Sequence, residues 1–352
     1  MKIVQSLKLS SEQLSTQSHY DYGMRAVKSI ILASGALRKD NPEQDEDITV
    51  LRAISVCNIP KFIQEDIDQF NGIISDLFPG TDNSPQQYEA VKHFVAASIH
   101  DHNLQWNQEF ETKIIQLYET VQVRHGLMLV GAPMGGKTTV MRTLADALSK
   151  MQQQKALDDI RSGLDTSLNK EDSKENMRLV KAPKVKIHSM NPKSVSISRL
   201  YGDYEKVGDW VDGILGLTVR EAASDKSGDT HWVMLDGPVD TLWIENLNTV
   251  LDDNKKLCLM SGEIIQMTDN MNMIFEPMDL QEASPATVSR CGMVYLQPEQ
   301  MGWRPMFDSW KNTLPSFFDN NPEEEENAKV KNIEELIDIV IEPMITYIRA
   351  EC

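Results

Sequence analysis

Short apolar runs alternate with longer polar or amphipathic segments through the middle of the chain. Each run is four to six residues long and rich in large or β-branched apolar side chains, as expected for buried strands. The segments between the runs have helical or loop composition. This alternation predicts an α/β fold in which a parallel sheet is flanked by crossover helices. The predicted strands are residues 125–130, 184–188, 232–235, 271–275 and 292–296.

The regions on either side of this core have helical periodicity. Apolar residues recur at helical spacing in 22–32 and 48–56, and an acidic loop at 40–47 separates the two predicted helices. A long amphipathic helix with interruptions is predicted over 86–121, before the first strand. The last predicted helix, 333–348, lies near the C-terminus. We therefore expect helical parts before and after the sheet.

Breaks in this pattern divide the chain into three predicted parts. Turn-forming sequence at 77–85 separates a helical part, residues 1–75, from the α/β part, residues 76–298. A polar, charged stretch at 152–177 interrupts the second part, and we expect it to be a mobile surface insertion. The third part, residues 299–352, is predicted to be helical.

The first predicted strand leads into Gly131-Ala-Pro-Met-Gly-Gly-Lys-Thr138, a complete match to the phosphate-loop pattern G-x-x-x-x-G-K-[ST]. A helical segment follows, so the loop has the flanking elements that the motif requires. Its glycines allow backbone amides to surround phosphate oxygens, and the helix N-terminus adds partial positive charge. We expect Lys137 to reach the β- and γ-phosphates and Thr138 to bind Mg²⁺. The predicted nucleotide contacts are Gly131, Ala132, Pro133, Met134, Gly135, Gly136, Lys137, Thr138 and Thr139.

The strand predicted at 232–235 ends in Asp236, which is the arrangement of a Walker B motif. Parallel strands would bring this aspartate to the sheet edge beside Mg²⁺ and Thr138. In hydrolysing members of this class the next residue is usually a glutamate that orients the attacking water, but here it is Gly237. Because a general base contributes about 10²–10⁴-fold in rate, the sequence predicts binding and makes hydrolysis doubtful. Glu245 is a conceivable substitute, although a helix-surface carboxylate or a cap is its more ordinary role.

Composition narrows the classes of partner. A length of 352 residues allows two domains, and the formal net charge of −18 argues against nucleic acid or an anionic membrane surface as the main partner. No apolar run approaches the roughly 20 residues needed to span a bilayer, and the N-terminus does not resemble a signal peptide. The 4 cysteines lie far apart, so a reduced intracellular compartment is expected, without a zinc site or disulfide framework. No N-K-x-D motif follows the core, which argues against a GTPase.

Long, specific runs occur at 11–15, 19–28, 131–138, 232–255 and 283–294. Together they resemble dynein heavy chains, most closely the axonemal, inner-arm type. The resemblance covers nearly the whole chain and implies an AAA+ P-loop core. By this resemblance, residues 1–75 are the helical lid of a preceding, first AAA+ module, 76–298 are the large domain of the second, and 299–352 are part of the second lid. The runs are 131–138, 232–255 and 283–294 for the second module, and 11–15 and 19–28 for the first lid.

The resemblance implies roles for two arginines at a nucleotide that another module binds, because each nucleotide in an AAA+ ring lies between neighbouring modules. Arg290 matches the arginine finger, whose guanidinium stabilises transition-state charge and is typically worth about 10³–10⁵-fold in rate. Arg25 is a candidate sensor-2 arginine for the same preceding module. Without the resemblance, Arg290 would be interpreted as part of a surface salt bridge and Arg25 as a charge on a helix face.

The resemblance also indicates that the chain's own site departs from an active ATPase. Where the family has a sensor-1 asparagine, this chain has Glu276 and Asp279, and carboxylates there would repel a γ-phosphate. Together with Gly237, this implies that ATP or ADP is held with Mg²⁺ and is not hydrolysed. Residues 201–210 and 257–267 fit the hairpins that this family uses to touch the linker.

The implied function is that of a nucleotide-binding segment of a microtubule motor, located in the cytoplasm and cytoskeleton and specifically in the axoneme of a cilium or flagellum. The implied partners are the remaining AAA+ modules and the linker. Intermediate and light chains and microtubules would be contacted only through the full-length motor, and neither nucleic acid nor a membrane is expected. Two alternatives stay open: a free-standing P-loop ATPase that uses Glu245 or Asp240, and an interaction module with a vestigial site.

Overall fold

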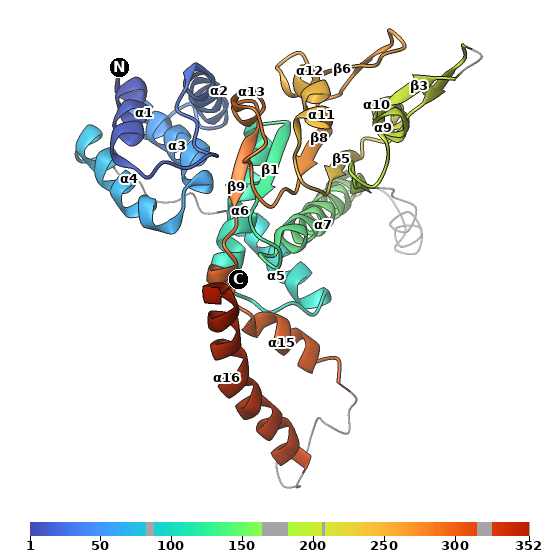
Figure 1. Cartoon of the computed structure of the whole chain (residues 1–352). Helices are drawn as coiled ribbons and strands as arrows, with labels where there is room; N and C mark the ends of the chain where they lie inside the picture. The colour runs from blue at the N-terminus through green and yellow to red at the C-terminus, as the bar shows by residue number, and fades with distance from the viewer. Residues whose placement is uncertain (82–87, 164–181, 206–207, 315–325, 352) are drawn as a thin grey trace. The chain divides into compact units, whose positions relative to one another are not determined.

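The computed structural model describes residues 1–81, 88–163, 182–205, 208–314 and 326–351. These residues form two compact units (Figure 1). The first unit contains residues 1–101 and 106–302, and the second contains residues 102–105 and 303–352. The nucleotide-related motifs all belong to the first unit.

A five-stranded parallel sheet forms the centre of the first unit. Its strands lie in the order β2-β5-β8-β1-β9. This order places the carboxyl ends of β1, β5 and β8 next to one another, which is where ligands bind in open α/β sheets. Every predicted strand is confirmed. The bounds are β1, Gly126–Val130; β2, Val185–Met190; β5, Thr230–Leu235; β8, Met271–Phe275; and β9, Gly292–Tyr295.

The central strands are apolar because helices and loops cover both faces of the sheet. All residues of β1 and β8 are buried, and the core also contains Trp232 of β5 and Trp243 of the following segment. Helices α5, α6 and α7 pack against one another, and α10 contacts β5. Their bounds are α5, Glu89–Asp101; α6, Gln108–Val123; α7, Lys137–Gly163; and α10, Ile214–Ser224. The helix predicted over 86–121 is thus two helices.

The N-terminal helices have a core of their own within the first unit. Buried Leu7, Ile54, Phe62 and Phe70 belong to this core. Asp45 begins one of the helices by accepting a hydrogen bond from the backbone N–H of Asp47, as N-cap residues do. The predicted helix 22–32 lies mainly in the second N-terminal helix, α2, and the predicted helix 48–56 lies in the third, α3. The bounds are α1, Lys2–Gln13; α2, Met24–Asp40; α3, Glu46–Asn58; η1, Ile59–Lys61; and α4, Gln64–Leu77.

The expected insertion at 152–177 is wrong for its first part. Helix α7 continues to Gly163, so residues 152–163 are helical, whereas 164–177 lie outside the described residues. The composition explains the error, because Gln, Lys, Ala and Leu are good helix formers that need no buried face. A hydrogen bond of 2.9 Å from Gln154 to Asp158 adds local support one turn along.

Two small hairpins extend away from the sheet (Figure 1). Strands β3, Gly202–Tyr204, and β4, Trp210–Asp212, pair antiparallel, as do β6, Lys256–Cys258, and β7, Ile264–Gln266. They coincide with the two predicted hairpin segments. The connecting helices are short: α9, Ile197–Tyr201; α11, Thr241–Ile244; η2, Glu245–Leu247; α12, Asn248–Leu251; α13, Pro285–Val288; and α14, Pro298–Met301.

The second unit is helical, as predicted for this region. Helix α15, Arg304–Lys311, is joined to α16, Glu326–Glu351, by an ion pair of 2.7 Å between Lys311 and Glu334. Helix α16 contains the predicted helix 333–348. Apolar side chains remain exposed along α16, among them Leu336, Ile339, Met344 and Tyr347. Among the described residues, no helix is long and apolar enough to cross a membrane.

Candidate functional site

The phosphate loop has the backbone that its glycines were predicted to allow. Gly131 follows the buried strand β1 and has a φ of 156°. A Cβ at this position would lie 2.1 Å from the carbonyl oxygen of Leu296, so any larger residue would collide with the backbone after β9. Gly136 has a φ of 78°, which is also the left-handed region. Helix α7 begins at the next residue and directs its N-terminus toward the loop.

Lys137 lies at the start of α7 and turns back over the loop. Its ammonium group donates hydrogen bonds to the carbonyl oxygens of Gly131, at 2.5 Å, and Ala132, at 3.3 Å. Burial lowers the pKa of Lys137, against the opposing influence of the Glu276 and Asp236 carboxylates. Since these contacts are to neutral carbonyls, phosphate oxygens are stronger partners for the same ammonium group.

Asp236 and Glu276 lie side by side at the end of the sheet. The pairing of Leu235 with Phe275 puts the next residue of each strand at the same edge, and the Glu276 N–H bonds the Leu235 carbonyl. The Glu276 carboxylate accepts a 2.6 Å hydrogen bond from the Thr138 hydroxyl. Burial raises the pKa of the Glu276 carboxyl, and Asp236 adds to this effect.

These oxygens fit a hard divalent cation. Thr138 offers a hydroxyl, Asp236 an exposed carboxylate, and Glu276 a buried carboxylate whose Oε1 has no hydrogen-bond partner. No cluster of three or more His, Cys, Asp or Glu side chains that could hold a metal occurs among the residues described. A Mg²⁺ ion here would therefore depend on these three side chains together with phosphate and water oxygens.

The residue directly after Asp236 has no carboxylate, and the two alternative bases, Asp240 and Glu245, have other roles. Gly237 has no side chain, and a Cβ there would lie 3.1 Å from the Asn191 side-chain oxygen. Glu245 is exposed on the surface at the start of η2, the ordinary role considered for it. The buried Asp240 caps α11 by accepting from the N–H groups of residues 242, at 2.8 Å, and 243, at 3.2 Å.

Asp240 also forms an ion pair with Lys193. Partial burial alone would raise the pKa of the Asp240 carboxyl, but Lys193 and the capping amides hold it below its usual value. A carboxylate stabilised in its charged form is a weaker base. The arrangement therefore argues against Asp240 as a general base.

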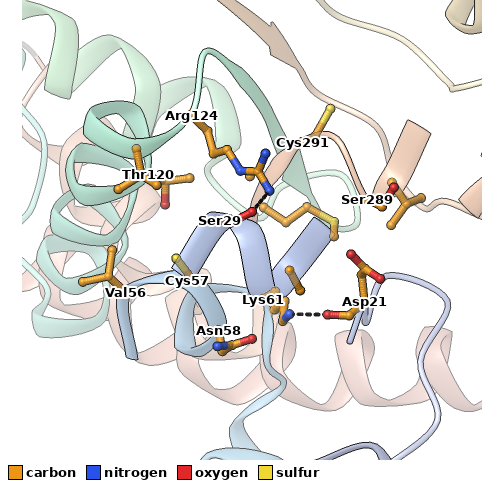
Figure 2. A pocket seen from close by; sticks show the side chains of 15 residues that line it. Asp21, Ser29, Val56, Cys57, Asn58, Lys61, Thr120, Arg124, Ser289 and Cys291 are labelled. Carbon is orange, nitrogen blue, oxygen red and sulfur yellow. Dashed lines mark hydrogen bonds between the residues drawn. The ribbon is translucent and has the colours of Figure 1, made fainter. Parts of the chain in front are cut away.

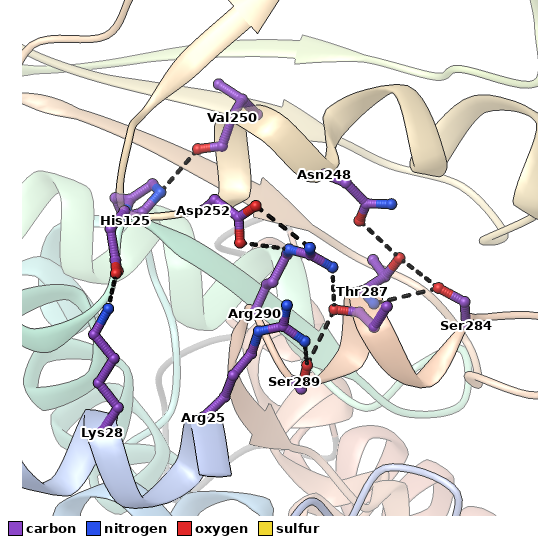
Figure 3. Close-up of polar contacts among 12 residues, drawn as sticks. Arg25, Lys28, His125, Asn248, Val250, Asp252, Ser284, Thr287, Ser289 and Arg290 are labelled. Atoms are coloured by element: carbon purple, nitrogen blue, oxygen red, sulfur yellow. Dashed lines mark hydrogen bonds and ion pairs between the residues drawn. The ribbon is translucent and has the colours of Figure 1, made fainter. Parts of the chain in front are cut away.

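Arg290 follows α13 and is held by contacts within the chain (Figure 3). Its Nε donates to the Asp252 carboxylate at 2.6 Å and its Nη2 to the other oxygen at 3.3 Å. Nη1 donates to the Ala286 carbonyl at 2.7 Å. The turn is fixed in its place because Ser284 caps α13 and Thr287 bonds the Asn248 amide oxygen at 3.1 Å. The surface salt bridge considered for Arg290 is thus present.

Arg25 lies close to Arg290, which the sequence did not require. From α2, its Nη1 donates a 3.0 Å hydrogen bond to the Ser289 hydroxyl, next to Arg290 (Figure 3). Lys28, one helical turn further, pairs with Asp253. These residues and Arg124 surround a cavity of about 150 Å³. We call the charged residues around it the arginine cluster: Arg25, Lys28, Arg124 and Arg290, with Asp252 and Asp253.

Sequence reasoning missed Lys28 and Arg124 as members of this cluster. The signal for Lys28 was its spacing from Arg25, since residues three apart share a helix face. Nothing local distinguishes Arg124, whose place depends on the packing of α2 against α6.

A second cavity, of about 50 Å³, lies where the N-terminal helices meet the sheet domain (Figure 2). Arg124 donates to the Ser29 hydroxyl across it, and the buried Lys61 donates to the Asp21 carbonyl at 2.8 Å. Burial lowers the pKa of Lys61 to about 8. Nearby, the His19 ring stacks on Tyr295 of β9, with ring centroids 4.6 Å apart. These contacts fix α2, and with it Arg25, against the sheet domain.

Comparisons with known proteins point to one family. The family model for the hydrolytic ATP binding site of the dynein motor region matches residues 1–138, which include the phosphate loop but not Gly237. The chain is 46% identical to mouse (Mus musculus) dynein axonemal heavy chain 12 over 353 residues, covering 100% of this chain and 10% of that protein. The chain is 48% identical to human (Homo sapiens) dynein axonemal heavy chain 3 over 316 residues, covering 90% of this chain and 7% of that protein.

Human dynein axonemal heavy chain 1 is 45% identical over 340 residues, which cover 96% of this chain and 8% of that protein. The chain thus spans about a tenth or less of the length of these curated relatives. The phosphate loop, the Walker B strand and the parallel sheet all lie within the aligned length. The chain therefore belongs to the dynein heavy chain family and corresponds to part of its ATP-binding motor region.

Proposed function

We propose that this chain is the part of an axonemal dynein ring that retains ATP or ADP with Mg²⁺ at its own phosphate loop without hydrolysing it. The observation that carries the proposal is the combination of an intact loop, Gly131 to Thr138, with Gly237 at the position of the water-orienting glutamate. Without a positioned base, hydrolysis loses about 10²–10⁴-fold in rate. Binding loses nothing, because the loop amides, Lys137 and the helix N-terminus are all present.

Each group has a defined part in holding the nucleotide. The amides of the loop and the N-terminus of α7 bind phosphate oxygens, and Lys137 exchanges its carbonyl contacts for the β- and γ-phosphates. Mg²⁺, when bound, neutralises phosphate charge beside Thr138 and Asp236. Gly237 leaves the attacking water without a base.

The arginine cluster supports a second role, toward the nucleotide of the preceding module. Arg290 and Arg25 lie together around one cavity, and the cluster has no phosphate loop of its own. An arginine finger acting on a neighbour's γ-phosphate is typically worth about 10³–10⁵-fold in rate. In this role Arg290 is the finger and Arg25 the sensor-2 residue, and the partners are the remaining AAA+ modules and the linker of the heavy chain.

The relatives' printed names place them in the axoneme, and we extend this location to the present chain as part of a ciliary or flagellar motor. Microtubules and intermediate or light chains would then be contacted through the complete heavy chain. The exposed apolar side chains on α16 are consistent with a further packing partner in such an assembly.

Nucleotide retention is tested by thermal unfolding of the purified chain with and without millimolar Mg-ATP. We expect a concentration-dependent rise of the midpoint temperature, because a ligand that binds only the folded state stabilises it. Lys137→Ala should abolish the rise. Lys155→Ala, which removes an exposed lysine from the same helix, should keep it.

The outcomes separate the proposal from its alternatives. An unchanged midpoint in the wild type would indicate an interaction module with a vestigial site and would contradict the proposal. Sustained phosphate release that is lost in Asp240→Asn or Glu245→Gln would indicate a free-standing ATPase instead.

A further inference from the structure

Glu276, the second carboxylate at the edge of the sheet, is buried, and only one of its two oxygens has a hydrogen-bond partner. It is 4% exposed, and its Oε2 accepts the 2.6 Å hydrogen bond from Thr138. Its Oε1 is buried without a hydrogen-bond partner. Buried carboxylate oxygens are normally paired or bound to a metal, because removing them from water without compensation costs several kcal/mol.

The surroundings of Glu276 add negative charge and no ion-paired cation. Asp236 occupies the neighbouring strand end. Lys137, the nearest positive side chain in the loop, donates its hydrogen bonds to the carbonyls of Gly131 and Ala132. Within the described ranges, no Lys or Arg forms an ion pair with Asp236 or Glu276. Lys137 and Arg142 attract the Glu276 carboxylate without forming an ion pair with it. The pair of carboxylates can therefore still accept a directly bound cation.

The donor set defines the kind of charge that fits. Two carboxylates and a hydroxyl are hard oxygen ligands, which Mg²⁺ and Mn²⁺ prefer over sulfur or nitrogen. Mg²⁺ commonly keeps several water ligands, so three protein oxygens are sufficient protein contacts. Asp236 is exposed whereas Glu276 is buried, so the Asp236 carboxylate is the solvent-facing member of the pair.

We propose that Glu276 is a metal ligand which, with Asp236 and Thr138, forms a divalent cation site that fills before nucleotide binds. Ordinary phosphate-loop sites hold Mg²⁺ largely through the phosphates of the nucleotide. Here the additional buried carboxylate supplies enough protein charge to hold the cation alone. This inference rests on the proposed function, since the cation would then prepare the same site for the nucleotide that it retains.

The test is titration of the nucleotide-free, full chain with Mn²⁺ alone, followed by electron paramagnetic resonance of free and bound Mn²⁺. We expect one saturable site in the wild type. Glu276→Gln should weaken Mn²⁺ binding by about tenfold or more, in the range seen when metal-site residues are lost. Asp279→Asn, which removes an exposed carboxylate three residues later, should change the affinity by less than about twofold.

A second variant covers the case in which Glu276→Gln does not fold. Thr138→Ala removes the hydroxyl and the γ-methyl group at the half-buried start of α7 and should also weaken Mn²⁺ binding. Wild-type affinity in Glu276→Gln, or in Thr138→Ala if the first variant is unfolded, would overturn the proposal, as would the absence of Mn²⁺ binding in the wild type. If Glu276 were protonated and neutral in the folded chain, Glu276→Gln would bind Mn²⁺ with wild-type affinity.

The outcome is independent of the nucleotide experiment. Mn²⁺ binding that depends on Glu276, without stabilisation by ATP, would support the cation site and contradict nucleotide retention. Stabilisation by Mg-ATP, without any effect of Glu276→Gln on Mn²⁺ affinity, would support nucleotide retention and contradict the cation site.

Discussion

The phosphate-loop site and the arginine cluster both suit phosphate, but they are built from different groups. The loop site combines backbone amides, one lysine and two carboxylates, and its ligand-binding groups come from the ends of β1, β5 and β8. The arginine cluster combines four cationic side chains from α2, α6 and the turn after α13, and it has no loop of backbone amides. In the proposed function, the loop site binds a nucleotide by itself, and the arginine cluster acts on a nucleotide that another module binds.

This difference separates the two requirements of ATP hydrolysis. The loop site has the groups that bind phosphates and lacks a positioned base at Gly237. The arginine cluster has positive charge of the kind that can stabilise a transition state, and it lacks a loop of amides that would hold a phosphate. Under the proposed function, nucleotide retention and catalytic assistance would therefore lie at different places in one chain, and each could be disturbed without the other.

The largest expected effect comes from removing the arginine finger. In a full-length heavy chain that carries this segment, Arg290→Ala should lower the steady-state ATPase rate about 10³-fold, because transition-state charge at the preceding module loses its partner. Arg199→Ala removes an exposed arginine from the same unit and should leave the rate unchanged.

Nucleotide retention at the loop site should survive Arg290→Ala. Thermal stabilisation of the isolated chain by Mg-ATP is the measurement, and its loss in this variant would show that the two sites are one functional unit. A rate within about threefold of the wild type would remove Arg290 from the proposed catalytic role.

A smaller effect is expected from pH, and it should act through the packing of the N-terminal helices. His19 is buried, its Nε2 bonds the Lys61 carbonyl at 2.9 Å, and burial lowers its pKa from 6.5 to about 4. Between these two pKa values the unfolded chain binds a proton that the folded chain does not, so stability falls as pH falls. Between pH 6.5 and 4.5 this amounts to about 2 kcal/mol in the free energy of unfolding.

His19→Gln keeps a donor for the Lys61 carbonyl and cannot be protonated. Denaturant unfolding of both proteins at the two pH values measures the difference, and the loss of stability should be about 2 kcal/mol smaller in the variant. An equal loss in both proteins would show that His19 is not the group that couples pH to the packing of α2 and its Arg25.

The central strands were predictable from the sequence because they are buried on both faces and therefore read as continuous apolar runs, as in Met271–Phe275. The phosphate loop was predictable because its glycines, Lys137 and Thr138 are contiguous. The polar extension of α7 was not, because a solvated helix and a solvated loop have similar composition. Here good helix formers at 152–163 decided the outcome.

The contacts between distant segments were less predictable. The sequence suggested that Glu276 would repel a γ-phosphate, but only the register of β5 and β8 shows that it lies beside Asp236 and bonds Thr138. Arg25 and Arg290 were singled out by resemblance to dynein heavy chains. Their proximity at Ser289, and the pairing of Arg290 with Asp252, depend on how α2 packs against the sheet domain.

The most direct test of the central claim is the fate of ATP bound at this chain's own site. Purified chain in excess is mixed with ATP and Mg²⁺, and bound nucleotide is identified after quenching at successive times. We predict that the wild type still holds ATP when Gly237→Glu, which adds the missing carboxylate, has converted it to ADP about 10²-fold faster. Conversion of bound ATP by the wild type at the rate of Gly237→Glu would contradict the account.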